Sequence, residues 1–76
     1  MNKARRKRIQ ELKDKLLDLL TTIEEIKDEE QEAYDNLPES FQDGDKGTKM
    51  TEAIDNLDSA FSSLEEAGEY LSETIQ

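Results

Sequence analysis

The densest group of chemically active side chains is a run of carboxylates in the first half of the chain. It comprises Glu24, Glu25, Asp28, Glu29, Glu30 and Glu32. Carboxylates on facing helices can hold paired metal ions, but bundle sites of that kind also use a Glu-x-x-His pair, and the chain has no His. We therefore interpret the run as a solvated helix face, and we expect no metal and no other cofactor.

A second group of possible ligands, Asp43 to Gly47 (DGDKG), looks like the start of a calcium loop. If Asp43 took position 1 of such a loop, Thr48 would stand at position 6, where glycine is needed. Ile54 would stand at position 12, where a bidentate Glu is needed. The pattern fails at both positions, so these residues indicate a polar turn.

The composition removes most catalytic chemistry. Without Cys or His, the chain has no thiol nucleophile, no imidazole acid or base, no disulfide and no zinc site of the usual ligands. Its 76 residues are near the lower limit for a stable single core. We expect one domain over residues 1–76, and no enzyme.

The first half of the chain predicts one long helix. Its apolar residues recur at alternating steps of three and four, the heptad period of packed helices. Glu30 is the one polar residue in this seam, and Leu37-Pro38 should end the helix because proline disfavours helical geometry in the preceding residue. We predict the helix over residues 4–36, with its seam at Ile9, Leu12, Leu16, Leu19, Ile23, Ile26, Ala33 and Leu37.

The second half predicts another long helix after a turn. Residues 37–47 hold the only proline and two of the three glycines, so they should reverse the chain, with room for one helical turn at 38–42. Thr48 is the candidate N-cap. We predict the second helix over residues 48–75, with its seam at Met50, Ile54, Leu57, Phe61, Leu64, Gly68, Leu71 and Ile75.

These elements predict an all-α fold, an antiparallel helical hairpin of two long helices. A turn centred near Gln42 places Leu16 opposite Gly68. In that register residues 1–8 project beyond the end of the second helix, so this basic N-terminal tip should have no partner within the chain.

Each of two packed helices buries only one face, so little buried apolar surface is left to stabilise a fold of this size. Other apolar residues widen the stripe of the first helix, and alanines recur one heptad apart on the second. We expect a homodimer in which two hairpins form a four-helix bundle. The expected dimer interface is Leu17, Leu20, Ala53, Ala60 and Ala67; the alternative is a monomer with a broad apolar stripe.

The charge is strongly divided along the chain. Residues 1–15 carry seven basic and two acidic side chains, a net of +5, so residues 16–76 carry −15 of the total of −10. The basic tip consists of Lys3, Arg5, Arg6, Lys7 and Arg8. Carboxylates along a rigid rod can imitate nucleic-acid phosphates, and the candidate acidic face is Asp28, Glu29, Glu32, Asp35, Asp55, Asp58, Glu65, Glu66, Glu69 and Glu73.

The basic tip could instead bind nucleic acid or an anionic membrane surface. It has no interleaved aromatic residue, and the acidic remainder repels a polyanion, so direct nucleic-acid binding is the weaker alternative. No apolar stretch follows the tip as in a secretory signal, and no run is long enough to span a membrane. We expect a cytoplasmic protein.

Two stretches, IKDEEQEAYDNLPESFQ (residues 26–42) and MTEAIDNLDSAFSSLEEA (residues 50–67), resemble small acidic coiled-coil proteins of phages and prophages of Gram-positive bacteria. The resemblance covers most of the chain after Arg5. It implies a phage accessory protein in the cytoplasm of a bacterial host, and binding and disabling a host defence or DNA-processing protein is a common task of such proteins.

These observations lead to one functional hypothesis and two alternatives. The hypothesis is a non-catalytic protein-binding inhibitor whose acidic helix faces occlude a basic host protein that handles nucleic acid, with DNA mimicry as the means. The first alternative is a self-assembling scaffold in which basic tips and acidic rods of different copies pair. The second is a nucleic-acid or membrane adaptor that acts through the basic tip.

Overall fold

A computed structural model describes residues 1–76 as three helices and no strand. Helix α1 spans Lys3–Asp35, the short α2 spans Glu39–Gln42, and α3 spans Asp45–Thr74. The predicted all-helical class is confirmed. The first long helix begins and ends within one residue of its predicted bounds.

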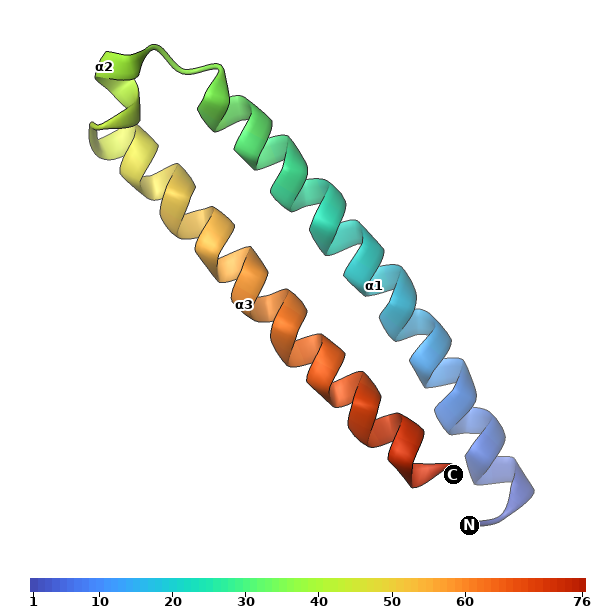
Figure 1. Cartoon of the computed structure of the whole chain (residues 1–76). Coiled ribbons are helices and arrows are strands. Elements are labelled where there is room, and N and C mark those ends of the chain that lie inside the picture. The colour runs from blue at the N-terminus through green and yellow to red at the C-terminus, as the bar shows by residue number, and fades with distance from the viewer.

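The two long helices lie side by side and run in opposite directions, so both termini lie at one end and α2 at the other (Figure 1). The resulting rod measures 58 × 15 × 13 Å. A Cβ atom on Gly68 would lie 3.1 Å from Cδ2 of Leu16, and Lys27 forms an ion pair with Asp58. These two contacts fix which residues of α1 and α3 stand at the same level.

Polar groups from outside the helix stabilise both ends of α1. At its start, the side chain of Asn2 accepts a hydrogen bond from the N–H of Arg5 at 2.9 Å, which satisfies one of the unpaired donors of a first turn. At its end, Nε2 of Gln42 donates to the carbonyl oxygens of Tyr34 at 3.1 Å and Leu37 at 3.2 Å. The turn therefore closes back onto the helix that precedes it.

Helix α3 begins three residues before its predicted start. Gly44 is its N-cap, and the N–H of Thr48 donates to the carbonyl of Gly44 at 3.0 Å, so the prediction of Thr48 as N-cap is wrong. Gly47 lies inside the first turn and is buried, and a Cβ there would stand 2.0 Å from the carbonyl oxygen of Gln42. Only glycine permits this approach of α2 and α3.

The seam between α1 and α3 holds a very small core. Leu16 and Ile54 are the only buried apolar side chains, each 9% exposed. Most other seam residues are half-buried, including Glu30, which forms no ion pair. This is little burial for a chain that must offset the conformational entropy of 76 residues.

Candidate functional site

Apolar side chains remain exposed along one side of the seam. Leu12, Leu19 and Ile26 follow one another at heptad spacing on α1 and are 51%, 55% and 47% exposed. Exposed aliphatic residues in such a row are typical of a surface that meets another helix. We call this side the leucine face; it comprises Leu12, Leu19 and Ile26 of α1 and the half-buried Leu57, Leu64 and Leu71 of α3.

The other side of the seam carries a shallow hollow between α1 and α3. Leu17, which is 62% exposed, and the half-buried Leu20 lie at its edge. The hollow is lined by Lys13, Leu16, Leu17, Leu20, Glu65, Gly68, Glu69 and Ser72. Its charged rim distinguishes it from the leucine face.

Helical geometry places these two surfaces on opposite sides of the helix pair. Leu17 and Leu19 are two residues apart and so lie about 160° apart around α1, and Glu65 and Ala67 lie about 160° apart around α3. Leu17 and Glu65 line the hollow together, so Leu19 and Ala67 share the opposite side. Leu64, three residues before Ala67, lies on that side too.

The structure therefore separates the predicted dimer-interface residues. Leu17 and Leu20 lie at the hollow, whereas the alanine row lies beside the leucine face, with Ala53 half-buried and Ala60 and Ala67 exposed. One partner surface cannot cover both sets. The heptad pattern predicts Leu12, Leu19 and Ile26 in the seam, whereas the structure leaves them exposed as a second row with the same spacing.

The ten candidate acidic residues are all exposed, but they do not form one patch. Those of α1 lie in the half nearest the turn, whereas most of those on α3 lie at the level of the first half of α1, because Leu16 stands opposite Gly68. The tightest group surrounds Tyr70, which is 61% exposed. It lines a second hollow with Ser62, Glu65, Glu66, Glu69 and Glu73.

Asp58 differs from the other candidate acidic residues because its carboxylate is already paired. Its hydrogen bond with the ammonium of Lys27, together with the negative charge of Asp58, raises the pKa of Lys27 above its usual value. This is the one ion pair in the structure. The remaining carboxylates are not neutralised by basic side chains of the same chain.

The basic tip is helical and does not lack a partner, contrary to the prediction. The guanidinium of Arg6 donates to the carbonyl oxygens of Ile75 and Gln76, both at 2.9 Å. A cation there complements the negative end of the α3 macrodipole, and α3 has no basic residue in its own last turn. The expectation that the basic tip has no partner within the chain is therefore wrong for Arg6.

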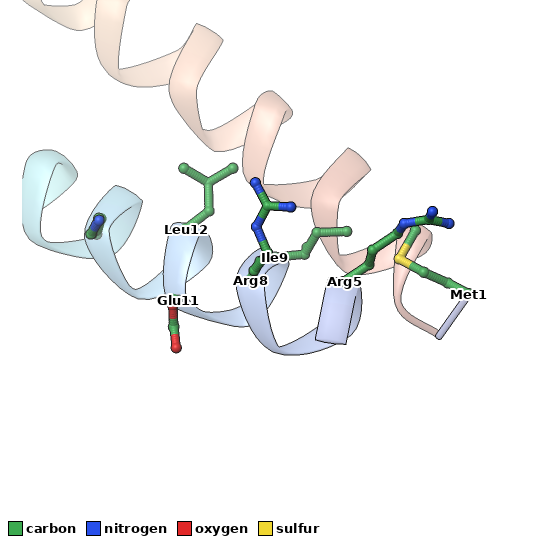
Figure 2. A pocket seen from close by; sticks show the side chains of 7 residues that line it. Met1, Arg5, Arg8, Ile9, Glu11 and Leu12 are labelled. Atoms are coloured by element: carbon green, nitrogen blue, oxygen red, sulfur yellow. The ribbon is translucent and has the colours of Figure 1, made fainter. Parts of the chain in front are cut away.

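Two of the remaining basic residues of the tip, Arg5 and Arg8, lie beside an apolar strip on α1. Figure 2 shows Leu12 and Arg8 on the same side of the helix, with Glu11 pointing the opposite way. Basic charge at the N-terminus of α1 opposes its macrodipole, so the stability of α1 does not explain its placement. The shallow hollow there is lined by Met1, Arg5, Arg8, Ile9, Glu11, Leu12 and Lys15.

Other features give no further site. No group of three or more His, Cys, Asp or Glu side chains has an arrangement suited to a metal ion. None of the helices combines the length and the apolar character that crossing a membrane requires. Protein-family models, curated proteins and solved structures contain no match to this chain. The leucine face and the charged surfaces are thus the candidates for function.

Proposed function

We propose that the chain is a non-catalytic protein-binding module of phage type. In this proposal it acts as an antiparallel helical hairpin that pairs into a homodimeric four-helix bundle. Its acidic helix faces occlude a basic host protein that handles nucleic acid. The observation that carries the proposal is the one ion pair among 20 acidic residues, which leaves a rod 58 Å long lined with unneutralised carboxylates.

The carboxylates around Tyr70 suit this function best. Glu66, Glu69 and Glu73 are spaced three and four residues apart, so they lie on one face of α3. A protein groove that binds phosphates presents Arg and Lys, which pair equally with carboxylates. The exposed ring of Tyr70 adds an aromatic anchor, a residue type enriched at binding hot spots.

Occlusion needs no turnover, which agrees with the residue chemistry of the chain. The complex would form quickly because opposite charges steer the two proteins together, and it would weaken as salt screens them. Inhibition would therefore be stoichiometric and sensitive to ionic strength.

The test is capture from a bacterial lysate at low and high salt, followed by a nucleic-acid-binding assay of the captured protein. We compare the wild-type chain with a variant in which Glu65, Glu66, Glu69 and Glu73 become Gln. The matched control changes Glu11, Asp14, Asp18 and Glu25 to their amides, which removes the same charge from exposed positions of α1.

The proposal expects a basic protein retained at low salt by the wild type and the control and lost by the Tyr70-cluster variant. The captured protein should lose nucleic-acid binding at equimolar inhibitor. Equal losses by the cluster variant and the control, or recovery of the chain alone, would contradict the proposal and favour the scaffold alternative.

A further inference from the structure

We propose that the leucine face is the surface through which two copies of this chain pair, with the second copy turned end for end. This inference rests on the homodimer of the proposed function, and it adds the interface and the orientation. It commits to one occupant of the face, a second copy, on grounds of symmetry, area and charge.

The first argument is the symmetry of the two apolar rows. Leu12 and Ile26 lie seven residues either side of Leu19, and Leu57 and Leu71 lie seven either side of Leu64. The contacts of Leu16 with Gly68 and of Lys27 with Asp58 place Leu19 opposite residues 65–66 on α3. The centres of the two rows, Leu19 and Leu64, therefore lie within two residues, or about 3 Å, of the same level of the rod.

A single two-fold axis through that level would bring both rows onto themselves. Leu19 would meet Leu19 of the second copy, Leu12 would meet its Ile26, and Leu57 would meet its Leu71. Such an isologous contact is closed, because the same patch is used on both copies. It also places α1 beside α1 and α3 beside α3, antiparallel, as in a four-helix bundle.

The second argument is the area of the face. The apolar rows span about 21 Å of helix, from Leu12 to Ile26, and two rods that overlap along their whole outline of 58 by 15 Å have room for the ~800 Å² that each partner buries in a standard interface. The exposed Ala60 and Ala67 beside Leu64 allow the two α3 helices to approach closely. The hollow side has no comparable apolar row.

The third argument is charge, which selects the orientation. Arg5 and Arg8 lie at one end of the α1 row, and Glu29 and Glu32 lie at the other. The end-for-end arrangement brings Arg8 within one helical turn of Glu29 of the second copy, at both ends of the interface. Copies stacked in the same direction would gather both basic tips at one end of the bundle, and complementary charges at helix interfaces are known to set orientation.

Disulfide cross-linking tests this geometry, because the chain has no Cys and any introduced cysteine is unique. Leu19→Cys stands on the proposed axis, so two copies should link readily in mild oxidant, since a disulfide needs Cα atoms within about 7 Å. Leu17→Cys is the matched control, because it is equally exposed but lies at the hollow. Sedimentation of the wild type gives the oligomeric state without any substitution.

The expected result is a wild-type dimer, at least tenfold faster linking of Leu19→Cys than of Leu17→Cys, and linking of an Arg5→Cys copy to an Ala33→Cys copy in a mixture. If the wild type were a monomer, the homodimer in the proposed function would be contradicted. A wild-type dimer that links through Leu17→Cys, or that links Arg5→Cys to itself as fast as Leu19→Cys, would overturn only the proposed face or its orientation.

Discussion

Two rows of aliphatic residues run along α1 at the same heptad spacing, yet their surroundings differ. The row that includes Leu16 packs on α3, and Leu16 is 9% exposed. The neighbouring row leaves Leu19 55% exposed. Because residue type and spacing are the same, the difference comes only from the direction in which α3 lies. The seam joins the two helices of one chain, and the leucine face stays exposed.

This contrast explains how so small a core can suffice. The two buried apolar side chains remove little apolar surface from water, and each Å² removed stabilises the fold by only roughly 25 cal/mol. Covering the six aliphatic residues of the leucine face by another copy would add burial without lengthening the chain. Folding and pairing should then be coupled, so that the unfolding temperature rises with protein concentration.

The largest expected effect is at the turn that sets the seam. In Gly47→Ala the new Cβ would stand 2.0 Å from a main-chain oxygen of Gln42, so α2 and α3 must move apart, with a loss of about 3 kcal/mol in the free energy of unfolding. Urea denaturation measures it. The control is Gly68→Ala, which meets only the flexible side chain of Leu16 at 3.1 Å and should change stability by less than about 1 kcal/mol. Equal losses of stability in the two variants would contradict the close approach of α2 and α3 at Gly47.

The next effect separates the seam from the hollow side within α1. Leu16→Ala should lower the free energy of unfolding by about 2 to 3 kcal/mol, because it removes a buried side chain. Leu17→Ala removes the same atoms from a side chain that is 62% exposed and should cost less than about 0.5 kcal/mol. The same denaturation experiment compares them. Similar losses would mean that Leu17 is covered in solution.

A smaller effect tests the charges that flank the leucine face. Arg8→Glu should weaken the dimer about fivefold, because it places a negative charge near Glu29 of the other copy at each end of the interface. Adding Glu29→Arg in the same chain should restore the dimer, since the antiparallel arrangement then pairs the reversed charges. Sedimentation equilibrium at low salt measures both constants. A double variant as weak as the single one would speak against the orientation.

The smallest effect concerns the exposed ion pair at the seam. The folded-state pKa of Lys27 is raised by its hydrogen bond to Asp58, so the pair contributes fully below the ordinary lysine pKa of 10.5 and is lost as pH rises through the folded-state value. Stability of the wild type should therefore fall slightly more than that of Asp58→Asn above that pH. Parallel pH profiles for the two proteins would show that the pair contributes nothing.

The sequence allowed the helices to be predicted because local signals act within a few residues. The restriction that proline places on Leu37 and the heptad period both operate over one or two turns, and the end of α1 agrees with them. The start of α3 was missed because Gly47 has low intrinsic helix propensity. Only the close approach of Gln42, five residues earlier at the end of α2, explains a glycine inside that turn.

The surfaces were less predictable, since their positions depend on the direction of a neighbouring helix. A sequence gives the angle between Leu16 and Leu19 around α1, but not which of them faces α3. For the same reason the sequence could not reveal that Arg6 reaches the carbonyl of Ile75, 69 residues away. The grouping of acidic residues around Tyr70 follows from helical spacing alone. It could therefore have been predicted from the sequence.

The most direct test of the leucine face is the mass of two variants by sedimentation equilibrium. Leu19→Glu and Leu17→Glu place the same charge on opposite sides of α1, at positions that are 55% and 62% exposed. We expect Leu19→Glu to be a monomer at concentrations where the wild type and Leu17→Glu are dimers. A dimeric Leu19→Glu, or a monomeric Leu17→Glu, would contradict the assignment of the leucine face as the interface.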